Sequence, residues 1–336
     1  MIFFSFFIIF LICHSMEIIL NDDENKDLQY LSSKIIFDPI NEPELFCSQS
    51  KNLSFFIPLR IRHILDEFKI HGNPNGFLLI KTSALNNNLP ATPENNLQHL
   101  GSYTELARIQ AILNSYLGEM VSYEAENDGY LFQDMVPSKN FEMTQTSLGS
   151  KVELEIHTEQ AFSNLKPDIL SLACLKGDND AKTYIFDVKN LLPHLTSHEQ
   201  LLLRKALWVC GIDYSFTLNN DFLTEHIRGP MPIIYGSEED PYFVFDQDLM
   251  VGITEESNNI LNKIIHLYKK YRTEYSLQAG DIVLVDNNRA VHGRSSFKPR
   301  FDGTDRFIVR SFILNEERFQ NSFYTRVDRM ILSIYS

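Results

Sequence analysis

An alternating stretch runs Lys151-Val152-Glu153-Leu154-Glu155-Ile156-His157 and continues as Thr158-Glu159. Polar and apolar residues alternate along this stretch, which is typical of a β-strand with one buried face. His157 and Glu159 are two residues apart, so an extended chain projects both side chains to the same side. The stretch therefore predicts a strand that presents an imidazole and a carboxylate to one shared ligand.

A second histidine follows another predicted strand. The run Gly280-Asp281-Ile282-Val283-Leu284-Val285-Asp286 indicates a buried strand, and His292 comes shortly after it in Val291-His292-Gly293-Arg294. Two imidazoles and one carboxylate are the ligand set of a mononuclear non-haem Fe(II) site. The plainer alternative is that these are surface or core residues, since the chain has ten histidines and a His-x-Glu motif also arises by chance.

Two arginines lie in a third strand-like segment, residues 306–314. Arg306 and Arg310 are four residues apart, which puts them on one face of a strand at a separation of about 13 Å. One guanidinium can hold one carboxylate through two charge-assisted hydrogen bonds. The pair is thus suited to two different carboxylates, while the simpler interpretation is a strand with solvated arginines.

Both motif blocks resemble those of clavaminate-synthase-like oxygenases of the TauD/TfdA superfamily. The first block is Thr144-Gln145-Thr146-Ser147-Leu148-Gly149-Ser150 leading to His157-Thr158-Glu159, and the second covers residues 280–294 and 299–310. The similarity extends from about residue 53 to about residue 314. It implies a mainly β fold with flanking helices around a double-stranded β-helix, or jelly-roll, core. It also implies an Fe(II)- and 2-oxoglutarate-dependent enzyme from the branch that hydroxylates free arginine, asparagine or lysine.

The resemblance also implies roles for single residues. Fe(II) is expected on His157, Glu159 and His292. Arg306 is expected to bind the distal carboxylate of 2-oxoglutarate, with Thr183 near that cosubstrate, and Arg310 to bind the α-carboxylate of the amino acid. O₂ is the other substrate, and succinate and CO₂ are released. No catalytic residue is expected beyond the metal site, because the chemistry needs no protein general base.

Four further residues are candidates for the substrate pocket. Glu126 lies near where relatives place a Gln or Glu that contacts the substrate amine, and Ser147 lies in a stretch that lines the pocket of relatives. Glu239 lies in an acidic run, residues 238–240, where arginine hydroxylases carry paired carboxylates, and Asp213 is another acid. The acids favour a polar or cationic side chain, arginine first, with lysine, asparagine and glutamine open. Alternatively, residues 238–240 form only a solvated turn before Pro241.

Composition narrows the function further. The net charge is −14 and no basic cluster is present, which argues against a nucleic-acid partner because neutralising phosphates takes many Lys and Arg side chains. No stable membrane partner is expected. The metal ligands must meet in one core, so we expect a single domain over residues 16–336. The four cysteines form no CxxC pair and fit a reducing compartment.

The first fifteen residues are apolar and lack the basic region of a secretory signal. They are interpreted either as an artefact upstream of a start at Met16, which we favour, or as a weak signal peptide or membrane anchor. A cytoplasmic location is expected, with a secreted or membrane-associated form as the alternative.

Helical periodicity predicts helices at residues 58–68, 104–120, 196–207 and 255–271, and short strands at residues 76–81 and 130–132. His194 and His198 are four apart near the third helix, and we interpret them as structural because no third ligand lies nearby. Two other functions stay open: the same iron chemistry on another small carboxylate or sulfonate, and a non-catalytic jelly-roll binding protein, since a fold does not fix a function.

Overall fold

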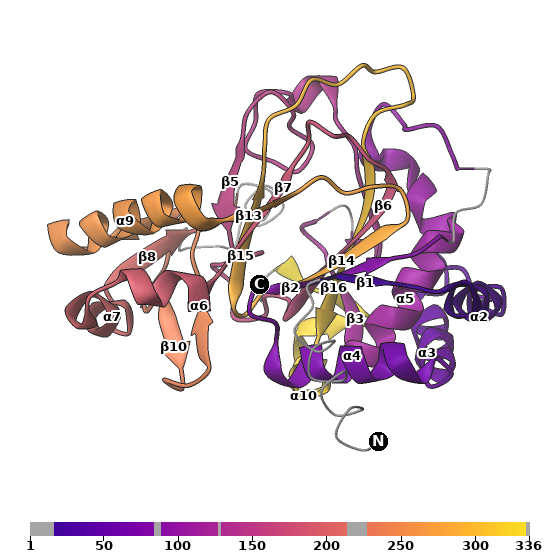
Figure 1. The fold of residues 1–336 in the computed structure, drawn as a ribbon, viewed down its shortest axis with the longest axis horizontal. Helices are drawn as coiled ribbons and strands as arrows, with labels where there is room; N and C mark the ends of the chain where they lie inside the picture. The colour runs from indigo at the N-terminus through magenta and orange to yellow at the C-terminus, as the bar shows by residue number, and fades with distance from the viewer. Residues whose placement is uncertain (1–16, 84–88, 127–128, 214–226, 334–336) are drawn as a thin grey trace, which may run out of the picture.

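Mixed β-sheets with flanking helices make up the protein (Figure 1). The computed structural model describes residues 17–83, 89–126, 129–213 and 227–333. In this part of the chain nine strands form the largest sheet, in the order β1-β2-β14-β6-β16-β3-β18-β17, with β4 also paired to β16. Their bounds are β1 Glu17–Ile19, β2 Phe77–Lys81, β3 Glu119–Tyr123, β4 Gln133–Met135, β6 Ile169–Lys176, β14 Asp281–Asp286, β16 Phe307–Leu314, β17 Arg326–Val327 and β18 Met330–Ile331.

A smaller sheet of four antiparallel strands lies beside the large one, in the order β13-β7-β15-β5. These strands are β5 Leu154–His157, β7 Thr183–Asp187, β13 Thr273–Tyr275 and β15 Ala290–Arg294. Two minor sheets are formed by other described residues: β8 Trp208–Gly211 pairs with β9 Ile227–Met231 and β12 Met250–Gly252, and β10 Ile234–Gly236 pairs with β11 Pro241–Phe243.

The large sheet is buried on both faces. Along β14, Ile282 and Leu284 belong to one apolar cluster, while Val283 and Val285 belong to another. The same alternation holds in β16, where Val309 joins the first cluster and Ile308 the second. Because successive side chains of a strand point to opposite faces, the sheet separates two apolar cores. Strands buried on both faces read as continuous apolar runs, as residues 282–285 do.

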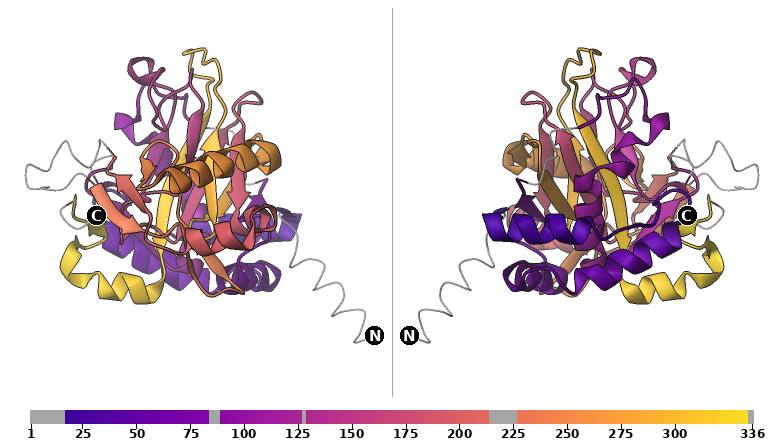
Figure 2. Two further views of the ribbon diagram at one scale, coloured as in Figure 1. Left: turned by 90° about the vertical axis from the view of Figure 1, so that its left-hand side faces the viewer. Right: turned by 90° about the vertical axis from the view of Figure 1, so that its right-hand side faces the viewer.

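Helices from the first third of the chain cover the outer face of the large sheet. They are α2 Asp22–Ser32, α3 Pro43–Ser54, α4 Leu59–His71 and α5 Glu105–Leu117, and they lie together on one side of the molecule (Figure 2). Their buried side chains, such as Phe46, Leu65 and Ile112, share one cluster with Ile282 and Leu284. The inner face of the sheet is thereby left to contact the four-stranded sheet.

Helix α9, Glu255–Tyr271, lies on the opposite side of the molecule (Figure 2). Its Tyr268 ring packs edge-on against Tyr184 and Phe186 of β7. The remaining helices are short: α6 Val188–Leu191, α7 Ser197–Leu203 and α10 Glu316–Asn321. His198 in α7 is exposed and lies 3.0 Å from Glu256, and His194 stacks on Tyr271, so the structure gives both histidines partners other than a metal.

The predicted helices are all present, and their ends differ by a few residues. The helix predicted at 196–207 is the shorter α7, which begins at a capping box formed by Thr196 and Glu199. Strand β4 lies at Gln133–Met135, just after the predicted 130–132. Strand β5 begins at Leu154 and not at Lys151, because Leu154 is the last residue that pairs with β15, opposite Arg294. The Lys151 amide instead donates to Glu142 O.

The apolar leader and Met16 lie outside the described residues, as do residues 84–88, 127–128, 214–226 and 334–336. Among the helices that the structure describes, none is both long and apolar enough to span a bilayer.

Candidate metal centre and binding cavity

The two predicted metal-binding histidines are cross-strand neighbours. Strand β15 pairs with β5 so that His292 lies directly opposite His157, and their ring centroids are 4.4 Å apart. Side chains of directly opposed residues project from the same face of a sheet, which brings both imidazoles to one point. One antiparallel strand pair thus brings together two histidines that are far apart in the sequence.

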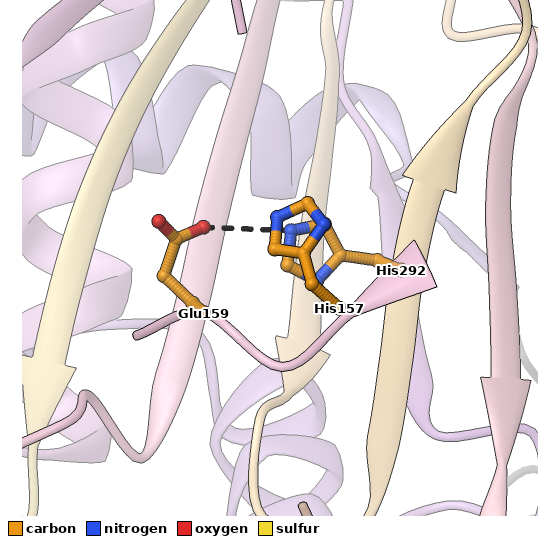
Figure 3. A group of neighbouring side chains, drawn as sticks. All are labelled: His157, Glu159 and His292. Carbon is orange, nitrogen blue, oxygen red and sulfur yellow. Dashed lines mark ion pairs between the residues drawn. The ribbon is translucent and has the colours of Figure 1, made fainter. Parts of the chain in front are cut away.

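Glu159 lies just beyond the end of β5. The chain between the two ligands is held by residue 245: the Thr158 amide donates to Phe245 O at 2.7 Å, and the Phe245 amide donates to Thr158 Oγ1 at 3.1 Å. The carboxylate of Glu159 then faces the two imidazoles, with Oε2 3.4 Å from His292 Nε2 (Figure 3). One ligand atom from each of His157, Glu159 and His292 lies within 4.8 Å of the others.

The environment keeps His292 neutral and Glu159 ionised, and a hydrogen bond orients the ring of His157. Burial, and then the neighbouring His157, lowers the pKa of His292 to about 4. Burial opposes ionisation of Glu159, but the charge of Arg310 and contacts with the two histidines lower the pKa of Glu159 to about 2. The His157 Nδ1–H donates to the Glu155 carbonyl at 2.8 Å, which leaves Nε2 as a lone-pair donor. Neutral imidazoles and an ionised carboxylate are the forms that bind a metal.

These residues fit an iron ion. Two nitrogen ligands and one carboxylate form the facial triad of non-haem Fe(II) oxygenases, which leaves the opposite side of the metal open. Glu159 Oε2 is buried and accepts no hydrogen bond from the described residues. A buried carboxylate oxygen that accepts no hydrogen bond destabilises the fold unless a cation binds to it, so the cluster is suited to a metal.

A cavity of about 300 Å³ opens beside this cluster, between the two sheets. The four-stranded sheet contributes His157, Thr183, His292 and Arg294, and the large sheet contributes Gln133, Leu170, Leu172, Ile308 and Arg310. Arg306, just before β16, lines it too, so residues 306, 308 and 310 face one cavity as the predicted strand period requires.

Arg306 has no hydrogen-bond or ion-pair partner among the described residues, although only 7% of its surface is exposed. Burial lowers the pKa of this guanidinium. Thr183 also lines the cavity, and its buried hydroxyl oxygen has no hydrogen-bond partner in the described part of the chain. Since an unpaired buried charge is unfavourable, this end of the cavity is suited to an anionic ligand.

Arg310 has partners already. Its guanidinium donates to Glu159 Oε1 at 3.0 Å, to Glu126 Oε2 at 2.5 Å and to Gln133 Oε1. Arg310 thereby joins a metal-ligand candidate to a substrate-pocket candidate. Burial raises the pKa of Glu126 to about 7, against the lowering effect of Arg310.

Three of the four pocket candidates reach the cavity. Glu126, Ser147 and Asp213 line it. Glu239 does not: it is exposed in the segment between β10 and β11, and the adjacent Asp240 is bonded to Arg289 at 2.9 and 2.5 Å. Asp240 is thereby paired with Arg289, and none of residues 238–240 lines the cavity, so the role of Glu239 as a substrate contact stays a prediction from the sequence.

The sequence reasoning missed several cavity residues, of which Asp246 is the most informative. Its Oδ1 accepts from the amides of Asp248 and Leu249, while none of its hydrogen bonds uses Oδ2. Burial raises its pKa to about 6. Asp246 reaches the site because its backbone bridges to His157. Its sequence context, Phe245-Asp246-Gln247-Asp248, gives no signal of that bridge.

Comparison with known proteins agrees with this geometry. Residues 104–312 match the family described as "Taurine catabolism dioxygenase TauD, TfdA family". The chain is 42% identical over 317 residues to an L-lysine 3-hydroxylase from Catenulispora acidiphila, a match that covers 93% of this chain and 88% of the relative. It is 27% identical to clavaminate synthase 2 from Streptomyces clavuligerus, over 85% of this chain and 89% of the relative.

Among solved structures, an asparagine oxygenase in complex with Fe(II), 2S,3S-3-hydroxyasparagine and succinate matches with a TM-score of 0.85 and 25% identity. That match covers 95% of this chain and 99% of the other. The non-haem iron oxygenase OrfP matches with a TM-score of 0.83 at 23% identity, which shows a shared fold.

Proposed function

The chain belongs to the TauD/TfdA family of dioxygenases, and on this premise we propose that it is an Fe(II)- and 2-oxoglutarate-dependent hydroxylase of a free L-amino acid. One observation carries the proposal: the cluster of His157, Glu159 and His292 opens into the same cavity as the unpaired Arg306. A metal and a dicarboxylate can therefore bind side by side. The two sheets that enclose the cavity fit a double-stranded β-helix core.

His157, Glu159 and His292 would hold the iron. Bound Fe(II) supplies the oxygen activation that no amino-acid side chain provides. The protein contributes placement and the exclusion of water, because all three ligands lie between two packed sheets. Arg306 would pair with the distal carboxylate of 2-oxoglutarate, and the unpartnered hydroxyl of Thr183 would donate to the same cosubstrate.

Arg310, Glu126 and Ser147 would position the amino acid. Four of the five N–H donors of Arg310 are used by Glu126, Glu159 and Gln133, so one donor on Nη1 is available to the α-carboxylate. Glu126 then lies beside that carboxylate and supplies a counter-charge for the α-ammonium group. An ammonium in such a site is tolerated because it is paired.

The acids of the cavity favour a cationic substrate side chain. Asp213, Asp246 and Asp248 all line the cavity, and Asp246 has one carboxylate oxygen that no residue of the described chain occupies. We expected arginine to be the best substrate; the L-lysine 3-hydroxylase at 42% identity shifts our preference to L-lysine, with hydroxylation at C3. Asp246 replaces Glu239 as the acid that we assign to the side-chain cation.

A direct assay tests this function. The purified protein is incubated aerobically with Fe(II), 2-oxoglutarate and one of lysine, arginine, asparagine, glutamine or leucine, and succinate and product mass are measured. We expect lysine to stimulate succinate release and to gain the mass of one oxygen atom. Succinate release that no amino acid stimulates would contradict the proposal. The single domain over residues 16–336 and the cytoplasmic location stay predictions from the sequence.

A further inference from the structure

We propose that Asn287 is a positioning residue of the metal centre, whose side-chain amide fixes the backbone of Glu159. This inference rests on the proposed iron site and adds a residue to it. Glu159 needs such support because β5 ends at His157. Beyond that point the Glu159 peptide has no neighbouring strand to hold its amide and carbonyl.

Asn287 supplies both missing bonds. Its Oδ1 accepts from the Glu159 amide at 2.8 Å, and its Nδ2 donates to the Glu159 carbonyl at 3.1 Å. The same Nδ2 also donates to Pro167 O at 2.8 Å. The side chain is fully buried, with 0% of its surface exposed. One amide thus reproduces the pair of bonds that a neighbouring strand would form with this peptide.

The amide can act as a rigid support because its own backbone is held. Asn287 lies in the turn between β14 and β15, its amide donates to Asp168 O at 3.0 Å, and its carbonyl accepts from Lys166 Nζ at 3.0 Å. The turn leads directly into β15, which carries His292. Asn287 therefore ties the segment of one metal-ligand candidate to the segment of another.

The position of the Glu159 carboxylate depends on how firmly its backbone is held. Its two oxygens lie 3.4 Å from His292 and 3.0 Å from Arg310, so a small shift of the peptide changes both contacts. Residues that orient a metal ligand commonly contribute roughly 10–100-fold to metal affinity. We expect a loss of this size when the two bonds from Asn287 are removed.

The neighbouring Asn288 offers a matched control. It lies in the same turn, donates to Asp168 at 2.8 Å and accepts from Lys166 at 2.6 Å, but has no bond to Glu159. Asn288→Ala therefore removes two partly buried side-chain hydrogen bonds of the same turn, against three buried ones for Asn287→Ala, without touching the metal-ligand candidate. A purely structural role for the turn predicts similar effects of Asn287→Ala and Asn288→Ala.

The experiment measures anaerobic Fe(II) affinity by competition with a chromophoric chelator for the wild type, Asn287→Ala, Asn287→Asp and Asn288→Ala. Melting temperatures of the metal-free proteins are recorded alongside. Asn287→Asp is nearly isosteric and keeps the Oδ1 acceptor but loses both Nδ2 bonds, so it serves if the alanine variant fails to fold. We expect weakening of roughly 10–100-fold for the Asn287 variants and less than threefold for Asn288→Ala.

The outcomes separate this inference from the proposed function. A wild type that binds no Fe(II) would overturn the iron site itself. If the wild type binds Fe(II) and the folded Asn287 variants bind it equally well, Asn287 does not position Glu159. Equal weakening in Asn287→Ala and Asn288→Ala would also overturn the inference, since it would assign the effect to the turn as a whole.

Discussion

The surroundings of each metal-ligand candidate fix its orientation or its protonation state. His157 is oriented by the Glu155 carbonyl, Glu159 is kept ionised by Arg310, and His292 is kept neutral by burial. None of these effects requires the metal to be present. The site is therefore organised before binding, which reduces the conformational cost that a metal would otherwise meet.

Replacing one imidazole should remove the iron site. We expect His292→Ala to reduce substrate-dependent succinate release to background and to weaken Fe(II) binding by more than the roughly 100-fold of an outer-shell change, because a three-ligand site cannot lose a ligand and keep its open face. Chelator competition and succinate assays measure both. His198→Ala is the control, since His198 is exposed and outside the cluster. Near-normal iron binding by His292→Ala would contradict the assignment.

Asp246 should select for a positively charged substrate side chain by pairing with it. Asp246→Asn keeps the Oδ1 acceptor for the amides of Asp248 and Leu249 but removes the negative charge. We expect the KM for lysine to rise by roughly 10–100-fold, in line with about 1.5–3 kcal/mol for a hydrogen bond to a charged group, with little change for 2-oxoglutarate.

Glu239→Gln is the comparison, because Glu239 is exposed and does not line the cavity. It should leave the KM for lysine unchanged. Equal effects of the two substitutions would return the side-chain assignment to the acidic run at residues 238–240.

At the level of elements, Asp187, the buried N-cap of helix α6, is expected to make the stability of the protein depend on pH. Asp187 caps α6 by accepting from the Lys189 amide at 2.6 Å, while its buried Oδ2 has no hydrogen-bond partner among the residues that the structure describes. Burial raises its pKa from 3.8 to about 7. Because the folded state holds the proton more tightly than the unfolded state, this group costs stability as pH rises from about 4 to about 7, after which the cost is constant.

Asp187→Asn should remove that pH dependence, because asparagine keeps the capping oxygen and does not titrate. The melting temperature of the variant relative to the wild type should therefore increase with pH between 4.5 and 8, by roughly 2–5 °C in total. Thermal melts of the metal-free proteins at several pH values measure it. A difference that is constant across pH would show that ionisation of Asp187 is not the cause.

Some strands and site residues could be predicted from the sequence, and others could not. The strand that precedes His292, β14, and the strand that carries Arg310, β16, could be predicted because apolar runs and a period of two are local signals. The start of β5 could not, because it depends on where β15 stops pairing, opposite Leu154. Similarly, His157, Glu159 and His292 could be identified because they lie in two recognisable sequence motifs. Asp246 and Asn287 reach the site only through hydrogen bonds between segments that are distant in the sequence.

At the scale of the whole molecule, the two sheets divide the binding tasks. The histidines belong to the four-stranded sheet, while Arg310 lies in the large sheet and Arg306 directly precedes its strand β16. A 2-oxoglutarate molecule that contacts both the metal and Arg306 would connect the two sheets. Its binding energy would then contribute to the stability of their packing, since a ligand that binds only the folded state raises stability by mass action.

Metal and cosubstrate should therefore stabilise the protein together. Under anaerobic conditions we expect Fe(II) with 2-oxoglutarate at about 100 times its Kd to add about 2.7 kcal/mol over Fe(II) alone, or roughly 5 °C in Tm. Without metal, 2-oxoglutarate should shift Tm little, because Arg306 alone offers one carboxylate contact. Arg306→Ala should keep the Fe(II) shift and lose the additional shift from 2-oxoglutarate. If 2-oxoglutarate raises Tm equally with and without metal, or equally in Arg306→Ala and the wild type, the cosubstrate does not connect the two sheets in this way.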